Sequence, residues 1–344
     1  MYRLEDSILN FPLKREDTFE RLQGLVAEKL AAKPALLTAE RERLETELSI
    51  VKETGAAGVF LFFYDTMYAL NGVGAVCHGI IHCSYLCYVL RVTKVNPLDY
   101  RLPFARFFGK NRKSLPSVSF AVEKGGKGEA LRYLKARYGV DKIARVSDGE
   151  NEYFLSRKSL LNLGGIDETV LHANSADKKV WHEDISALTA RDGWRLNLYS
   201  FGIEEAEIGE YRRFTDEEIY QKTLQIFKER DLEFGDTYYQ TLLDEKKYRG
   251  VYAAEEIFAP TGGKFIFQEQ FFEICEKLLG VGGQTADEFR KDIIKRKRKE
   301  VQEIRALFLE KLGEDGEDLF AYLQKNLLYT FSKAYAIGRL FIDL

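Results

Sequence analysis

Five residues of the kinds that bind metals lie in one short apolar stretch, CHGIIHCSYLC at residues 77–87. They are Cys77, His78, His82, Cys83 and Cys87. His78 and His82 are four residues apart, as are Cys83 and Cys87, so each pair could share a helix face and bind zinc. The spacing matches none of the usual zinc-knuckle patterns. A buried helix with reduced core cysteines is the alternative, and we expect no bound metal.

A run of basic residues, RKDIIKRKRK at 290–299, could contact phosphate groups. Seven of its ten residues are Lys or Arg, although the chain has a net charge of −3. On a helix of 3.6 residues per turn, about four of the seven could reach phosphates together. The alternative is a solvated helix face balanced by nearby acidic residues such as Glu300 and Glu303. A second basic stretch, GKNRK at 109–113, would extend a positive surface.

The stretch SLPSVSFAV, residues 114–122, predicts a short strand that begins near a proline. Its apolar positions alternate with small uncharged ones, which are Ser117, Ser119 and Ala121. No histidine lies nearby in sequence and no nucleophile elbow surrounds either serine, which argues against a serine hydrolase. His172 and His182 could approach in space, but nothing in the sequence predicts that they do.

Composition excludes several classes of protein. The 344 residues have room for one or two domains, and 45% hydrophobic with 31% charged residues is typical of a globular chain. Four cysteines in this length do not form a disulfide framework. No signal peptide is apparent, and no apolar run reaches the roughly 20 residues of a membrane helix. We therefore expect a cytoplasmic protein that does not bind membranes.

Local patterns predict helices around a mixed central region. Residues 1–37 form a helical lead-in, and Thr38 is a plausible N-cap for a helix that ends at Gly55. Residues 140–212 mix strand-like runs with turns. From Thr215 onward helical patterning dominates, punctuated by glycines at 262–263, 280–283 and 313–316. This order predicts an α+β first part and a helical second part.

Five segments, in this order, resemble bacterial DNA polymerase III alpha subunits, the C-family replicative polymerases. RLETELSIVKETGAAGVFLFFYD (43–65) resembles the opening of the family's palm, and YVLRVTKVNPLDYRLPFARFF (88–108) the segment that leads to its catalytic strand. APTGGKFIFQEQFFEICEKLLG (259–280) and FRKDIIKRKRKE (289–300) resemble its fingers. FSKAYAI (331–337) resembles the segment that closes that region.

The resemblance implies a fold and a domain order. We expect a nucleotidyltransferase-type palm sheet with flanking helices, followed by a mostly helical fingers-like region. The domains would be the lead-in at 1–37, a palm-like domain with a reduced thumb at 38–212, and a helical fingers-like domain at 213–344. The family's N-terminal phosphoesterase domain would be missing, so the resemblance predicts a truncated relative.

The resemblance also implies that the catalytic site has degenerated. In the family, three aspartates alternate along the strand after the proline, and another lies in a later strand. The matching positions here are Ser117, Ser119, Ala121 and Asn197. Two-metal phosphoryl transfer needs anionic oxygen ligands, so we expect no bound Mg²⁺ and no cofactor. The family's Gly-Arg-Gly-Ser phosphate loop corresponds to Cys77, His78, Gly79 and Ile80, and Tyr335 lies near where the family has a histidine.

These features predict a non-catalytic polymerase III alpha-like protein that acts as a DNA-binding or scaffolding subunit in replication or repair. A partner protein would supply the catalysis, and DNA binding would be weak and non-specific. The expected contacts are Arg290, Lys291, Lys295, Arg296, Lys297, Arg298, Lys299, Lys110, Arg112 and Lys113. One alternative is an active DNA-directed DNA polymerase that binds Mg²⁺ through relocated ligands such as Asp65, Glu45 or Glu47. Another is a protein-interaction module that does not bind DNA.

Overall fold

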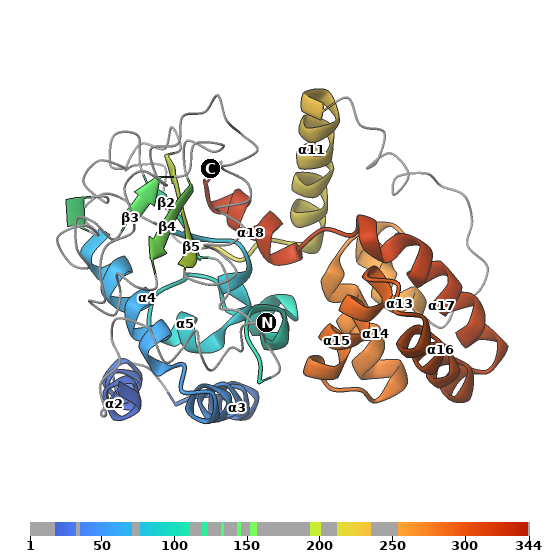
Figure 1. Ribbon diagram of the computed structural model, residues 1–344, viewed down its shortest axis with the longest axis horizontal. Helices are drawn as coiled ribbons and strands as arrows, with labels where there is room; N and C mark the ends of the chain where they lie inside the picture. The colour runs from blue at the N-terminus through green and yellow to red at the C-terminus, as the bar shows by residue number, and fades with distance from the viewer. Residues whose placement is uncertain are drawn as a thin grey trace. The chain divides into compact units, whose positions relative to one another are not determined.

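The computed structural model describes residues 18–31, 35–70, 76–110, 118–122, 132–133, 143–145, 152–156, 193–200, 212–234 and 254–342 (Figure 1). The chain divides into two compact units. Unit 1 takes in the chain up to Leu98, Phe107–Glu210 and the last residues from Phe341, and unit 2 takes in Asp99–Arg106 and Tyr211–Leu340. Within the described residues, no helix has the length and apolar character needed to cross a membrane.

Unit 1 combines helices with one five-stranded sheet. Its elements are α2 (Thr18–Ala31), α3 (Thr38–Glu53), α4 (Ala57–Leu70), β1 (Val76–His78), η2 (Ile80–Cys83), α5 (Tyr85–Val89), β2 (Val118–Val122), β3 (Ile143–Arg145), β4 (Glu152–Ser156) and β5 (Gly193–Ser200). The strands lie in the order β1-β2-β5-β4-β3. β2 pairs with β5 in parallel, and the other neighbouring pairs are antiparallel.

The core of unit 1 is aromatic. Helix α4 is apolar over most of its length. The centre of its Phe60 ring lies 6.2 Å from the ring centre of Phe107 and 6.0 Å from that of Phe108, and both pairs are edge to face. Such ring pairs add to the free energy gained by burying the rings. Phe120 of β2 is also fully buried. Helix α2 packs against α4 and α5, and α3 packs against α5, which fixes α5 relative to α3.

The start of α3 differs from the prediction. Thr38 is the first helical residue, and Leu37 occupies the N-cap position. The Leu37 amide donates to the Glu40 carboxylate at 2.9 Å, so a glutamate side chain stabilises the helix start without a capping hydroxyl. The helix ends at Glu53, and Gly55 follows with a φ of 64°.

Unit 2 is helical in its described residues. Its elements are α11 (Asp216–Phe234), α13 (Glu255–Phe258), η6 (Ala259–Thr261), α14 (Gln268–Leu279), α15 (Gly283–Ile294), α16 (Arg298–Leu312), α17 (Glu314–Asn326), η7 (Leu327–Tyr329) and most of α18 (Lys333–Ile342). Helices α13 to α17 enclose one apolar core that includes Phe258, Phe271, Phe308 and Leu319. Helices α16 and α17 pack directly against each other (Figure 1).

Candidate functional site

The small uncharged positions of β2 lie on an interior strand of the sheet. Ser119 is in register with Asn197 of β5 on one side and with His78 of β1 on the other. Ala121 is in register with Tyr199 and Val76, and Ser117 lies outside the described residues. The sheet therefore brings Ser119 and Asn197, two of the expected metal-ligand positions, onto directly paired strands.

One acidic position lies in the same row. Glu152 of β4 is in register with Asn197. The four register positions from β1 to β4 are therefore His78, Ser119, Asn197 and Glu152. Among the residues that the structure describes, no group of three or more His, Cys, Asp or Glu residues could hold a metal ion.

The segment expected to match a phosphate loop contains one unusual backbone position. His78 ends β1, and Gly79 follows with φ 88° and ψ −146°, which side-chain-bearing residues rarely adopt. Ile80 then begins the short η2 helix, and Ser84 caps α5. The Ser84 hydroxyl accepts the Cys87 amide at 3.1 Å.

The backbone amides at the start of α5 donate to a carboxylate of the same chain, that of Glu47. Buried Glu47 of α3 accepts hydrogen bonds from the amides of Tyr85 at 2.8 Å and Leu86 at 2.9 Å. It also accepts the Ser84 hydroxyl at 2.8 Å and the Arg43 guanidinium at 2.7 Å. Because all of these donors converge on one side chain, Glu47 joins α3 to α5 and is committed to that role. Glu45, by contrast, is exposed on α3.

Replacing Glu47 with glutamine should destabilise unit 1 by about 3–5 kcal/mol, the usual range for breaking a buried ion pair. The amide of glutamine would replace one acceptor oxygen with a donor, and that donor would face other donors. Chemical denaturation measures the change in the free energy of unfolding. The exposed Glu45→Gln variant on the same helix is the control and should change stability by less than about 0.5 kcal/mol. Equal stability of the two variants would contradict this role of Glu47.

The cysteine–histidine stretch packs inside unit 1. Cys77, Cys83 and Cys87 are buried free thiols, as is Cys275 in unit 2. The Nδ1 atom of His82 lies 2.6 Å from the Thr93 hydroxyl in the core. Burial raises the pKa of the Cys77 thiol well above its usual value and also raises that of Cys87. Burial raises the pKa of Cys275 to about 12.

Thiol reagents should therefore react negligibly with the native protein at pH 8, because the thiolate is the reactive form and these thiols are inaccessible. After denaturation, all four cysteines of the chain should react. A colorimetric thiol titration measures both states. Metal analysis of the same preparation tests the zinc alternative. Stoichiometric zinc in the wild type that is absent from a Cys83→Ala, His82→Ala double variant would support that alternative. Rapid labelling of the native protein would contradict the packing.

Several of the seven basic residues of the run are already paired within unit 2. Arg290 is largely buried and donates to Asp287 at 2.9 and 3.1 Å, and Lys291 lies 2.5 Å from the other oxygen of Asp287. Burial raises the pKa of Asp287, but Arg290 and Lys291 outweigh burial, and the net shift is downward. Lys297 pairs with Asp292 at 2.6 Å.

The run does not lie on one continuous helix, on which about four of the basic residues were expected to act together. Helix α15 ends at Ile294, Arg296 adopts a left-handed φ of 53°, and α16 begins at Arg298. Five consecutive basic residues, from Lys295 to Lys299, are exposed across this turn. In the other basic stretch, Lys110 pairs with Glu53, and residues 112 and 113 lie outside the described residues.

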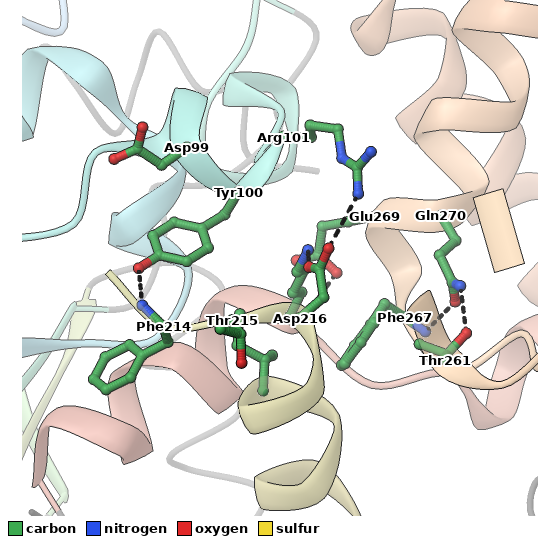
Figure 2. Close-up of polar contacts among 12 residues, drawn as sticks. Asp99, Tyr100, Arg101, Phe214, Thr215, Asp216, Thr261, Phe267, Glu269 and Gln270 are labelled. Carbon is green, nitrogen blue, oxygen red and sulfur yellow. Dashed lines mark hydrogen bonds and ion pairs between the residues drawn. The ribbon is translucent and has the colours of Figure 1, made fainter. Parts of the chain in front are cut away.

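Sequence reasoning did not foresee a polar cluster in unit 2 (Figure 2). Asp216, at the start of α11, pairs with Lys333 at 2.7 Å and with Arg101 at 3.5 Å. Burial raises the pKa of Asp216, but the hydrogen bond from Lys333 and the nearby cations outweigh burial and lower it. Buried Glu269 accepts the amides of Lys333 at 2.8 Å and Ala334 at 3.3 Å. These bonds fasten the start of α18 to α11 and α14.

The cluster lines a pocket in which each cation faces an acid. Arg101 contacts Glu273 at 3.7 Å as well as Asp216, and Lys333 pairs with Asp216. Both cations that line the pocket are therefore paired with carboxylates. Beside it, the Gln270 amide oxygen accepts the Phe267 amide at 2.8 Å, and its nitrogen donates to the Thr261 hydroxyl at 2.9 Å. The sequence signal was the family resemblance alone, since Arg101, Glu269 and Lys333 each lie in a segment that resembles the polymerase III alpha subunit.

Comparison with known proteins identifies related sequences. The model of the bacterial DNA polymerase III alpha NTPase domain matches residues 18–158, and that of the DNA polymerase III alpha subunit finger domain matches residues 231–316. An error-prone DNA polymerase of Cutibacterium acnes is 34% identical over 110 residues, covering 31% of this chain and 10% of that protein. The DNA polymerase III subunit alpha of Mycoplasma genitalium is 28% identical over 173 residues, covering 47% and 19%.

A DNA polymerase III subunit alpha of Borreliella burgdorferi is 32% identical over 142 residues, covering 39% of this chain and 12% of that protein. The matched part of this chain thus spans between about a tenth and a fifth of the length of these relatives. The two matched models describe two parts of the same kind of subunit. The chain is therefore a bacterial DNA polymerase III alpha-like protein.

Proposed function

We propose that this chain is a non-catalytic, DNA-binding relative of the polymerase III alpha subunit that acts in a replication or repair complex. In this proposal the five-stranded sheet of unit 1 is a palm remnant, and the helices of unit 2 are a fingers remnant. A partner protein supplies the catalysis, and this chain contributes contacts with phosphate groups. The chain requires no Mg²⁺ or other cofactor for this role.

The observation that carries the proposal is the neutral pair at the centre of the sheet. The family resemblance expects metal-binding aspartates on the strand after the proline and on a later strand. Ser119 and Asn197 stand at these positions and are in register on paired strands. A hydroxyl and an amide carry no charge, whereas Mg²⁺ ions in phosphoryl-transfer sites are held by carboxylates.

The start of α5, a few residues after the segment matched to the phosphate loop, offers no phosphate site of its own. A helix start can bind a phosphate when its free amides point at the anion. Here the amides of Tyr85 and Leu86 donate to the buried Glu47 carboxylate, and the amide of Cys87 donates to Ser84. An incoming phosphate would have to displace an internal carboxylate that is itself paired with Arg43.

Primer-extension assays should show no nucleotide incorporation above a buffer control with either Mg²⁺ or Mn²⁺. With a serine and an asparagine at positions 119 and 197, these two positions of the sheet cannot hold two metal ions between a primer terminus and a nucleotide. A full-length polymerase III alpha subunit serves as the positive control. The proposal would be overturned if the pure protein extended a primer in a template-dependent way and a Glu152→Gln variant did not. That result would favour the alternative of an active polymerase with relocated ligands, because Glu152 is the acidic position in register with Asn197.

The second candidate is a protein-interaction module that does not bind DNA. The paired cations of the unit 2 pocket favour it, since the carboxylates of that pocket neutralise Arg101 and Lys333. The two candidates differ in one measurement, which is binding of primed duplex DNA at low salt. Binding that weakens with salt favours the DNA-binding role, and no binding favours the interaction module.

A further inference from the structure

The described residues contain three non-glycine positions with a positive φ, and all three are arginines. They are Arg91 (59°), Arg101 (55°) and Arg296 (53°). The left-handed conformation strains any residue with a side chain, and glycine is the usual occupant. Arg101 pairs with Asp216 and Glu273. Arg91 and Arg296 are both exposed, and neither has a side-chain partner among the residues that the structure describes.

Arg296 occupies a defined place at the end of α15. Its amide donates to the Ile293 carbonyl at 3.1 Å, and the Lys297 amide donates to the Asp292 carbonyl at 3.1 Å. These two bonds form a Schellman motif, in which Arg296 holds the left-handed position that favours glycine. The turn therefore forms despite its side chain, and the strained residue is presented to solvent at its tip.

Among the described residues, three cations at this tip have no ion-pair partner. Lys297 pairs with Asp292, and Lys299 lies 3.9 Å from Glu303. Lys295, Arg296 and Arg298 are exposed and have no ion-pair partner among the described residues. A guanidinium can bind two phosphate oxygens at once, which an ammonium cannot. A strained arginine that, like its neighbouring cations, has no partner among the described residues points to a ligand with phosphate oxygens.

We propose that Arg296 is a principal phosphate-binding residue of this chain and that a phosphodiester of nucleic acid is its ligand. The inference rests on the proposed DNA-binding function and assigns it to one residue and one turn. Favourable interaction of a cation with the carboxyl end of α15 is the competing explanation. It predicts an effect of Arg296 on stability but none on binding.

The test compares Arg296→Gly with Arg91→Gly. Arg91 follows α5 in the same motif, because its amide donates to Tyr88 at 3.0 Å and the Val92 amide donates to Cys87 at 2.9 Å. Each variant removes one positive charge and relieves the same backbone strain, so both should fold and be at least as stable as the wild type. Arg296→Gly should weaken binding to primed duplex DNA about tenfold at low salt. The slope of log K against log salt should become shallower by about 1.

Arg91→Gly should bind as the wild type does. Arg296→Lys keeps the charge and should retain the salt slope while losing part of the affinity. If the wild type does not bind primed DNA at low salt, the proposed function and this inference both fail. If the wild type binds and Arg296→Gly binds equally well, only this inference fails. Equal weakening in the Arg296 and Arg91 variants would also overturn it, because net charge alone would then explain the loss.

Discussion

Reversing the charge of the three cations at the α15–α16 turn that have no ion-pair partner among the described residues should reduce binding to primed duplex DNA by more than about 100-fold at low salt. The variant replaces Lys295, Arg296 and Arg298 with glutamate, so each attraction to a phosphate becomes a repulsion. Lys297 is left unchanged because it pairs with Asp292. The wild type should bind in the micromolar range that is typical of non-specific contacts. Its log–log salt slope should be near −3, since about three phosphates are neutralised.

A matched control carries the same change in charge elsewhere on unit 2. Lys228, Lys311 and Lys325 are exposed on α11, α16 and α17, and their replacement by glutamate should lower the affinity only slightly. Fluorescence anisotropy at several salt concentrations measures both the affinity and the slope, and circular dichroism checks that both variants are folded. Equal loss of binding in the two variants would contradict a binding site at the turn. It would leave only a general effect of the protein's net charge.

The local elements of this chain could be predicted because their signals are local. Alternation of apolar and small residues predicted the strand that is now β2, and β5 lies within residues 140–212, where strand-like runs were predicted. The register of Ser119 with Asn197 could not be predicted from such patterns, because it depends on pairing between strands that are far apart in the sequence. The family resemblance proposed both positions, and the structure brings them together.

Glu47 shows why acidic residues were difficult to interpret from sequence. As a residue type, it was a candidate metal ligand. Its donors on α5 lie 37 to 39 residues further along the chain, and no local pattern shows that they converge on it. The packing of α3 against α5 decides its role. A buried carboxylate with several donors stabilises the fold, whereas a metal ligand needs lone pairs that remain available.

The basic run was misread for a different reason. Helix ends are usually recognised by glycine, asparagine or proline, and none of these occurs between Arg290 and Lys299. The Schellman turn at Arg296 therefore gave no sequence signal, and a continuous helix was predicted. The error matters for function, because a turn exposes five consecutive basic residues whereas a helix would expose only part of them on each face.

Gly316 misled in the opposite direction, and its replacement should have a large effect on stability. The glycines at 313–316 predicted a break between helices. Gly313 does end α16, with a φ of 64°, but Gly316 is buried inside the first turn of α17. A Cβ atom at Gly316 would overlap the Phe308 carbonyl oxygen and lie 2.7 Å from its carbonyl carbon. The missing side chain is what allows α17 to approach the backbone of α16.

Gly316→Ala should therefore destabilise unit 2 by about 3 kcal/mol or more, because a backbone group must move to admit the methyl group. The melting temperature should fall by roughly 6–12 °C at about 2–4 °C per kcal/mol. Gly24→Ala is the matched control, since Gly24 lies within α2 and a Cβ atom added there would have no other atom within 4 Å. There alanine should stabilise the helix by about 0.5–1 kcal/mol, so the same substitution has opposite signs at the two sites. Thermal melts and hydrogen exchange of residues 298–326 measure the difference, and an unchanged or raised melting temperature in Gly316→Ala would show that α16 and α17 do not approach as closely as described.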